Sequence, residues 1–158
     1  MNIIADNLEG PAVVALLQDH LASMAAQSPP ESCHALDLEG LKHPSVTFWS
    51  VWDGTNLMGC GAIKELDPLH GELKSMKTAP SYLKQGVART LLQYMLDEAN
   101  RRGYHRVSLE TGSTIGFKPA RQLYSRFGFS YCEPFGDYGE DPNSVFMTLA
   151  LPVTVPKK

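Results

Sequence analysis

The chain has 158 residues, of which 43% are hydrophobic and 20% are charged, and its formal net charge is −3. This length fits one domain with a sizeable core, spanning residues 1–158. The mild acidity excludes a general nucleic-acid binder, which needs a basic surface, and no apolar run approaches the roughly 20 residues that cross a bilayer. Neither nucleic acid nor a membrane is therefore expected as a partner.

The N-terminal part of the chain is predicted to be helical. Residues 9–26 carry apolar side chains at helical spacing, which predicts a first helix. The Ser-Pro-Pro run at 28–30 ends this helix in a loop, and residues 34–41 are predicted as a short second helix. The first six residues lack the basic start and long apolar core of a secretory signal, so a cytoplasmic location is expected.

The centre of the chain is predicted to form three consecutive strands. Residues 46–52 are rich in β-branched and aromatic side chains, which indicates a strand. The turn cluster 53–56 leads into its hairpin partner, residues 57–66. After a second turn, residues 72–78 form the third strand, and Pro80 ends it because proline cannot donate to a sheet.

The turn at residues 82–89, Tyr-Leu-Lys-Gln-Gly-Val-Ala-Arg, separates the third strand from a long amphipathic helix. This helix is predicted over 87–102, with Gly103 as its C-terminal cap. The first amides of a helix have no partner inside it and lie at its positive end, so a phosphate can bind there. Because Gly86 and Ala88 lack bulk, a ligand can approach the backbone closely.

The last third of the chain alternates strand and helix. Its predicted elements are a strand, a helix and two further strands, at 105–111, 117–127, 129–133 and 145–151. The whole order is helices, three strands, helix, strand, helix and two strands. This order favours an α/β fold of the α+β type, with one central, mostly antiparallel sheet flanked by helices.

Metal and disulfide chemistry are not expected. The three cysteines, Cys33, Cys60 and Cys132, are odd in number and widely spaced, which argues against a disulfide framework and a zinc site. The five histidines are scattered along the chain without a ligand spacing such as His-x-x-x-His. No metal is therefore predicted.

The chain carries two short motifs, Leu-Lys-Gln-Gly-Val-Ala at 83–88 and Ala-Arg-Gln-Leu-Tyr-Ser-Arg-Phe-Gly-Phe at 120–129. Together they resemble the GNAT superfamily of acyl-CoA-dependent N-acetyltransferases. The first family pattern is Gln/Arg-x-x-Gly-x-Gly/Ala, which residues 83–88 match at Gly86 and Ala88 and miss at Leu83. The second is Ala-x-x-Leu-Tyr-x-x-x-Gly-Phe, which residues 120–129 match in full. The two motifs occur in the family's order, separated by a helix and a strand, and this makes the resemblance specific.

The resemblance covers about residues 46–151, and the run 135–147 is also similar to one group of small bacterial GNAT proteins. Phe117 departs from the pattern, because the family often carries Asn there, before the helix of the second motif. The resemblance implies a single GNAT-like domain that uses acetyl-CoA as co-substrate. Superfamily members are often dimers, so a homodimer is among the expected states.

The resemblance also implies where acetyl-CoA binds. The pantetheine arm would lie along the end of the third strand like an added strand, and the turn after it would cradle the pyrophosphate. The expected cofactor-binding residues are Met76, Lys77, Thr78, Lys84, Gln85, Gly86, Val87, Ala88 and Arg89. The alternative is an ordinary strand followed by a plain turn with solvated basic residues.

Three residues are candidates for the chemistry. By resemblance, Tyr124 would give a proton or hydrogen bond to the thiolate of coenzyme A as it leaves. The acceptor amine must lose a proton before it attacks, because an alkylammonium has no lone pair. By resemblance, Glu72 lies where the histone-acetylating members carry their glutamate base, and Glu110 is a second candidate. Either carboxylate could act through a water. The alternatives are a core aromatic for Tyr124, a solvent-facing residue paired to Lys74 for Glu72, and a salt bridge for Glu110.

An acidic loop before the last strand is a candidate for acceptor binding. Asp137, Tyr138, Glu140 and Asp141 could attract a cationic amine, and the alternative is a solvated loop. The sequence thus predicts transfer of an acetyl group from acetyl-CoA to a primary amine of a small molecule or peptide, by direct attack. A non-catalytic acyl-CoA-binding or regulatory module on the same fold is the alternative.

Overall fold

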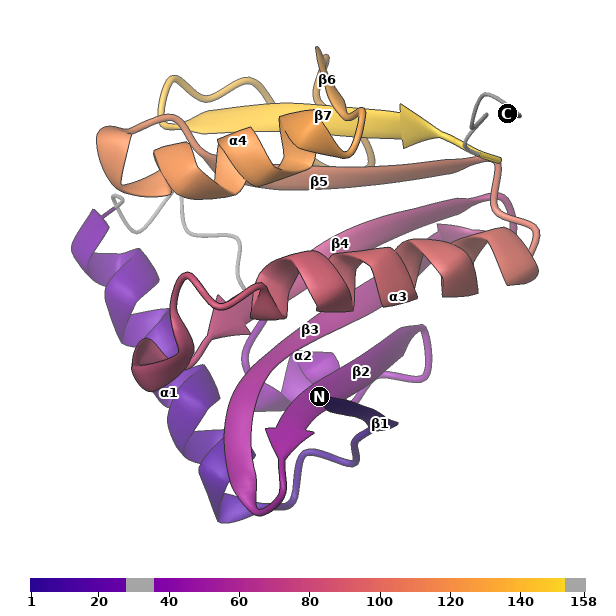
Figure 1. Ribbon diagram of the computed structural model, residues 1–158. Helices are drawn as coiled ribbons and strands as arrows, with labels where there is room; N and C mark the ends of the chain where they lie inside the picture. The colour runs from indigo at the N-terminus through magenta and orange to yellow at the C-terminus, as the bar shows by residue number, and fades with distance from the viewer. Residues whose placement is uncertain (28–35, 153–158) are drawn as a thin grey trace.

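The computed structural model describes residues 1–27 and 36–152 and is drawn in Figure 1. The strands are Asn2–Ala5 (β1), Val46–Asp53 (β2), Asn56–Asp67 (β3), His70–Thr78 (β4), Arg106–Gly112 (β5), Ser130–Cys132 (β6) and Ser144–Ala150 (β7). The helices are Pro11–Gln27 (α1), Leu38–Leu41 (α2), Val87–Arg101 (α3) and Lys118–Arg126 (α4), with 3₁₀ turns at Pro80–Tyr82 and Ile115–Phe117.

The described strands form one sheet in the order β1-β2-β3-β4-β5-β7-β6. β4 and β5 run parallel, and the other neighbouring strands run antiparallel. The expected mixed, mostly antiparallel sheet flanked by helices is therefore confirmed. None of the helices in the two described ranges is both long enough and apolar enough to cross a membrane.

Two N-terminal elements differ from the prediction. β1 was not predicted, because four residues are too few to show an alternating pattern, and its residues are placed by pairing with β2. The second helix begins later than expected, at Leu38, where the Asp37 carboxylate caps it by accepting a hydrogen bond from the Gly40 amide at 2.8 Å. The first two residues of the predicted helix, and Cys33, lie outside the described residues.

Helices cover both faces of the sheet, and a separate hydrophobic cluster lies under each pair of helices (Figure 1). The cluster under α1 and α2 includes Leu8, Val13, Leu16, Leu17, Leu41, Phe48, Cys60 and Ala62. The cluster under α3 and α4 includes Ile63, Leu73, Leu91, Leu92, Met95, Val107, Leu109 and Tyr124. Successive strand residues point to opposite faces, so each strand contributes to both clusters.

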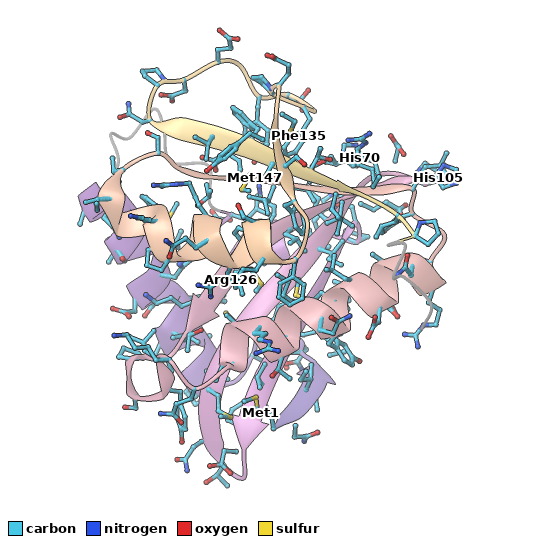
Figure 2. All side chains as sticks on the ribbon, turned by 45° about the horizontal axis from the view of Figure 1, so that its top comes forward. Met1, His70, His105, Arg126, Phe135 and Met147 are labelled. Atoms are coloured by element: carbon cyan, nitrogen blue, oxygen red, sulfur yellow. The ribbon has the colours of Figure 1, made fainter. Side chains whose placement is uncertain are left out.

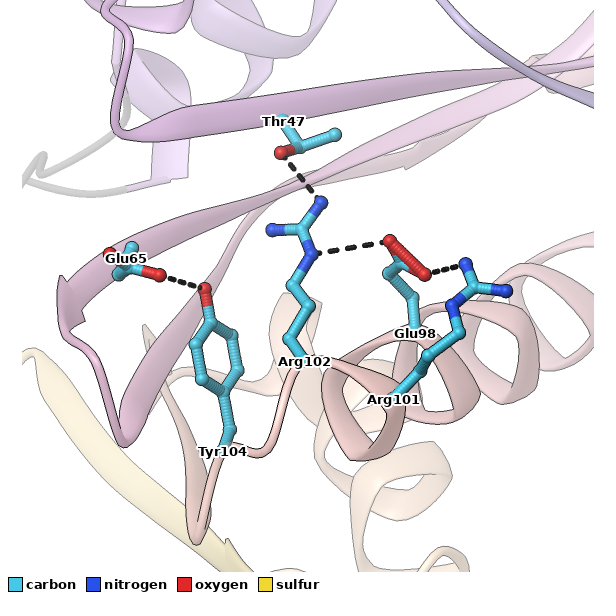
Figure 3. A network of polar contacts seen from close by, with 6 residues as sticks. All are labelled: Thr47, Glu65, Glu98, Arg101, Arg102 and Tyr104. Atoms are coloured by element: carbon cyan, nitrogen blue, oxygen red, sulfur yellow. Dashed lines mark hydrogen bonds and ion pairs between the residues drawn. The ribbon is translucent and has the colours of Figure 1, made fainter.

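α3 is held to the sheet along its length and at its C-terminal end. Its buried side chains recur at helical spacing, as Val87, Leu91, Leu92, Met95, Leu96 and Ala99. Each fully buried Val, Leu or Met side chain stabilises the fold by roughly 1.5–3 kcal/mol. At the C-terminal end, Arg102 donates to Thr47 Oγ1 at 2.9 Å and to Glu98 at 3.2 Å, and Tyr104 donates to Glu65 at 2.8 Å (Figure 3). These contacts hold the C-terminal end of the helix against β2 and β3.

β4 and β5 separate halfway along their length. Their pairing runs from His70–Arg106 to Leu73–Leu109. Beyond that point β4 stays paired with β3 as far as Thr78, while β5 stays paired with β7 as far as Gly112. Figure 1 shows the two strands diverging there. Beyond the Leu73–Leu109 pair, the facing edges of β4 and β5 are therefore not paired with each other.

A β-bulge lies in β4 at the point of divergence. The register between β3 and β4 shifts after the Ala62–Lys74 pair, and Ser75 has a φ of 57°. This left-handed conformation is uncommon for a residue with a Cβ atom and costs free energy. The bulge also changes which face the side chains take: Leu73 packs in the α3 and α4 cluster, and so does Met76, three residues later.

Candidate active site

A cavity lies where β4 and β5 diverge. It leaves about 110 Å³ for the centres of water-sized molecules. From the α3 and α4 side it is lined by Leu73, Leu109, Thr111, Phe117, Ala120 and Tyr124. From the α1 side it is lined by His20, Met24, Glu72, Lys74, Glu110 and Tyr138. The cavity therefore joins the two faces of the sheet through the gap between two strands.

The structure brings together five residues that the sequence named separately. Tyr124, Glu72, Glu110, Tyr138 and Met76 all line this cavity. They come from α4, β4, β5 and the loop before β7, and the longest separation in the chain is 66 residues, between Glu72 and Tyr138. A shared cavity with convergent polar groups is the usual form of a small-molecule site.

Tyr124 is both a core residue and a residue of the cavity wall. Its side chain is 7% exposed and packs edge-on against Phe129, with ring centroids 5.7 Å apart, so it belongs to the core. It also lines the cavity, and its hydroxyl makes no hydrogen bond with any described residue. Burial raises the pKa of Tyr124 well above its usual value, so the hydroxyl keeps its proton at neutral pH.

Glu72 lies at the centre of a buried polar triangle. Its Oε2 accepts a hydrogen bond from the Tyr138 hydroxyl at 2.6 Å and from the Lys74 ammonium at 3.1 Å. Lys74 also donates to the Tyr138 oxygen at 2.9 Å. Glu72 is paired to Lys74, as considered from the sequence, but it is not solvent-facing, because only 3% of it is exposed. Burial and the Glu72 charge raise the pKa of Tyr138, so this hydroxyl remains a donor.

An aromatic cluster holds Tyr138 over the cavity. The Phe135 ring lies 5.2 Å from the Tyr138 ring and 5.8 Å from each of the Phe146 and His70 rings. Figure 2 shows Phe135 and His70 side by side at the sheet. The Tyr138 ring also lies 5.4 Å from Phe146. Contacts of this kind add about 0.5–1.5 kcal/mol each beyond burial, which fixes a loop that has no regular secondary structure.

The other three residues of the predicted acidic cluster lie elsewhere. Asp137 lines a groove beside the cavity, and the two share Glu72, Lys74 and Tyr138 as a common wall. Glu140 and Asp141 line a different hollow, together with β6 and the start of β7. Of the four candidates for acceptor binding, the structure thus places Tyr138 in the cavity, Asp137 next to it, and Glu140 and Asp141 apart from it.

The turn before α3 presents unpartnered amides. Gly86 is the N-cap of α3 with a φ of 82°, and no side chain caps this end. Among the described residues, none accepts a hydrogen bond from the amides of Val87, Ala88 or Arg89. Lys84 also has a left-handed φ, of 61°, and it is exposed together with Gln85 and Gly86. This geometry fits an anion at the positive end of the helix.

The end of β4 leads from the cavity to this turn. Met76 lines the cavity, while Lys77 and Thr78 pair with Cys60 and Gly59 of β3 on one side. The other side faces the gap left by β5, so the strand has an open edge there. Lys77 also lies 3.9 Å from Asp19 of α1. The open edge fits an extended ligand that adds to the sheet as a strand would.

The sequence did not point to His20 or Ser75 as cavity residues. His20 comes from α1, far from both motifs, and its lone position in the sequence carries no signal. Ser75 lines the cavity at the bulge, and its buried hydroxyl has no hydrogen-bond partner among the described residues. A strained backbone and an unsatisfied hydroxyl at one residue are typical of functional sites. Neither is visible in a pattern of residue types.

Stability is expected to fall in acid through His20. Burial and the nearby Lys77 lower the pKa of His20 from 6.5 to about 4, against a smaller opposing effect of Asp19. Between these pH values the unfolded chain binds a proton that the folded chain does not, so the stabilisation is complete above pH 6.5 and is lost as pH falls towards 4. The loss is at most about 3 kcal/mol.

In the variant His20→Gln, the melting temperature should change less between pH 6.5 and 4 than it does in the wild type. The melting temperature is measured by calorimetry at steps of half a pH unit. His105→Gln is the matched control, because His105 is exposed and should leave the wild-type slope unchanged. Equal slopes in the wild type and His20→Gln would contradict the buried, neutral state of His20.

Comparison with known proteins identifies a family model and relatives that match this chain. A model of the Acetyltransferase (GNAT) family matches residues 13–129. The uncharacterised N-acetyltransferase YsnE of Bacillus subtilis is 61% identical to this chain, over 96% of the chain and 100% of its own length. The uncharacterised N-acetyltransferase YedL of Escherichia coli is 55% identical, over 94% of each chain.

A solved structure shows the same fold. An aminoglycoside 6'-N-acetyltransferase complexed with coenzyme A superposes with a TM-score of 0.71, covering 99% of this chain and 100% of that one, at 16% identity. At that identity the likeness concerns the fold alone. The family model covers well over half of the sequence, and both relatives align over nearly their whole length. The chain therefore belongs to the GNAT family of acetyltransferases.

Proposed function

We propose that this protein transfers the acetyl group of acetyl-CoA to a primary amine by direct attack. The observation that carries the proposal is the cavity between β4 and β5, with Tyr124 on one face of the sheet and Glu72 on the other. A thioester arriving from the α3 side and an amine arriving from the α1 side would meet there. Both relatives bear the name of uncharacterised N-acetyltransferases, and the solved neighbour is complexed with coenzyme A, which supports the proposal.

The cofactor would be held by main-chain groups more than by charge. The free amides of Val87 to Arg89 would bind its diphosphate, with Lys84 and Arg89 adding positive charge. The open edge of β4 at Met76 to Thr78 would take the pantetheine arm by hydrogen bonds of the sheet type. Binding at both points would leave the acetyl group at the cavity.

The reaction needs two proton transfers from the amine nitrogen. An alkylammonium with a pKa near 10.4 first gives one proton to a carboxylate, which we assign to Glu72, acting directly or through a water. The neutral nitrogen then attacks the thioester carbonyl, and its bond to carbon forms as the carbon–sulfur bond breaks. Tyr124 gives its proton to the departing thiolate and regains one from the acylated nitrogen, while the first proton passes from Glu72 to solvent.

The proposal is tested by thiol release from acetyl-CoA with a panel of primary amines, with the acetylated product confirmed by mass spectrometry. The panel includes simple alkylamines, amino acids, polyamines and peptides with free N-termini. Amine-dependent thiol release with a matching product supports acetyl transfer. Binding of acetyl-CoA without turnover on any amine would favour the non-catalytic module instead.

Glu72→Gln should lower kcat/KM at neutral pH by about 100-fold, because the variant keeps the size of the side chain but cannot take up a proton. Glu110→Gln is the matched comparison, since Glu110 lines the same cavity from β5. We expect a smaller loss there, because Glu72 is the carboxylate held in place by two hydrogen bonds. A larger loss in Glu110→Gln would make Glu110 the base and the assignment of Glu72 wrong.

A further inference from the structure

Lys74 places a buried ammonium in the wall of the cavity, and holding Glu72 in place uses only one of its three N–H groups. Its side chain is 8% exposed. It donates to Glu72 Oε2 at 3.1 Å and to the Tyr138 oxygen at 2.9 Å. A buried charge is costly unless it is paired and hydrogen-bonded, and removing one partner leaves the other uncompensated. A site that needed only a negative field for a cationic amine would not require this positive group.

One N–H group of the Lys74 ammonium has no acceptor among the described residues. An ammonium carries three N–H groups, and two of them have partners within residues 1–27 and 36–152. The Glu72 carboxylate also keeps hydrogen-bonding capacity. Both of the hydrogen bonds that it accepts from described residues end on Oε2, and none ends on Oε1. Lys74 and Glu72 also line both the cavity and the adjoining groove, so open volume borders the pair on two sides.

The pair has the form of a receptor for a zwitterion. Its carboxylate and ammonium lie side by side, 3.1 Å apart. An α-amino acid carries the same two charges on one carbon atom, so it can lie antiparallel to the pair. Its amino group then faces Glu72 and its carboxylate faces Lys74, and every charge has an opposite neighbour in a site of low dielectric constant.

We propose that the acceptor is an α-amino acid, whose carboxylate binds the Lys74 ammonium while its amino group faces Glu72. This inference rests on the proposed acetyl transfer and names its acceptor class. The groove beside the pair, with about 520 Å³ and with Leu36 and Leu66 in its lining, gives room for the amino-acid side chain. A peptide or protein lysine has no free carboxylate next to its amine and does not satisfy this pair.

The test uses pairs of acceptors that differ by one carboxylate: L-alanine and ethylamine, L-phenylalanine and phenethylamine, L-methionine and 3-(methylthio)propylamine. We expect kcat/KM to be larger for the amino acid of at least one pair. Because the two amines of a pair also differ in basicity, the measured quantity is the ratio of the two kcat/KM values in the wild type, in Lys74→Met and in Lys74→Arg. The difference in basicity is the same for all three proteins and cancels.

The ratio should fall at least about 10-fold in Lys74→Met, which corresponds to one charge-assisted hydrogen bond, and recover in part in Lys74→Arg. An unchanged ratio, or a wild type that acetylates the amine of every pair as well as the corresponding amino acid after correction for basicity, overturns the amino-acid assignment. If neither member of any pair is acetylated, the proposed acetyl transfer itself fails, which is a different outcome.

A second measurement needs no variant and therefore does not depend on whether Lys74→Met folds. Propanoate has the carboxylate of L-alanine without the amino group. It should inhibit the wild type competitively against the amino-acid acceptor, whereas 1-propanol at the same concentration should not. Absence of inhibition by propanoate at concentrations that saturate with L-alanine would also overturn the role of Lys74.

Discussion

Replacing Tyr124 by phenylalanine should lower kcat by about 100-fold while the dissociation constant of acetyl-CoA stays unchanged. The buried Tyr124 hydroxyl keeps its proton at neutral pH, because burial raises its pKa, and it has no partner among the described residues that would compete for it. It is thus free to protonate a leaving thiolate. Phenylalanine keeps the edge-on packing against Phe129 and removes only the hydroxyl.

The measurement is steady-state thiol release together with calorimetric titration of acetyl-CoA. Tyr131→Phe is the matched control, because Tyr131 is 61% exposed and does not line the cavity. This control should keep the wild-type kcat. Equal turnover in Tyr124→Phe and the wild type, with thermal stability unchanged, would show that Tyr124 is a packing residue alone.

Gly86→Asp should weaken acetyl-CoA binding by roughly 30- to 150-fold, because about 2–3 kcal/mol of binding free energy is lost through a weaker helix-dipole interaction and added charge repulsion. An aspartate is a good N-cap, so its carboxylate would accept hydrogen bonds from the same amides that the diphosphate needs. The substitution also brings a negative charge to the site of an anion. Calorimetric titration with acetyl-CoA measures the effect.

Two controls separate charge from backbone strain. Gly86→Asn has nearly the same shape as Gly86→Asp without the charge, so it should bind acetyl-CoA more tightly than the aspartate variant. Gly103→Asp sits at the other end of α3 with a φ of 83°, close to the 82° of Gly86, and an added Cβ meets open space at both positions. Gly103→Asp should bind acetyl-CoA like the wild type. Equal weakening at the two glycines would contradict the phosphate role of the turn.

Local signals account for the parts of the fold and site that the sequence predicted. The glycine turn and the Tyr124 motif are each continuous in the chain, and the helices and most strands show regular hydrophobic spacing. Residues 1–5 had no such signal, because β1 exists only through its pairing with β2. Asp37 was missed as a cap for a related reason, since one acidic residue before a four-residue helix is a weak pattern.

The geometry of the cavity depends on contacts that no local pattern contains. Glu72 was named from its place on the strand, but its burial depends on Tyr138, 66 residues later. His20 enters the cavity because α1 crosses the sheet there, and Ser75 because a bulge turns its backbone. To predict the burial of Glu72 and the places of His20 and Ser75 in the cavity, one would need to know the register of β3 with β4 and the point where the pairing between β4 and β5 ends.

A single-turnover experiment tests acetyl transfer across this cavity most directly. Excess protein is mixed with acetyl-CoA labelled in its acetyl group and with an amine from the panel, the reaction is stopped at intervals, and the label is followed on cofactor, protein and amine. The structure leads us to expect one acetylated amine for each coenzyme A released, with the mass of the protein unchanged throughout. Label that passes through the protein, or that stays on the cofactor with every amine tried, would contradict direct transfer between the diverging strands.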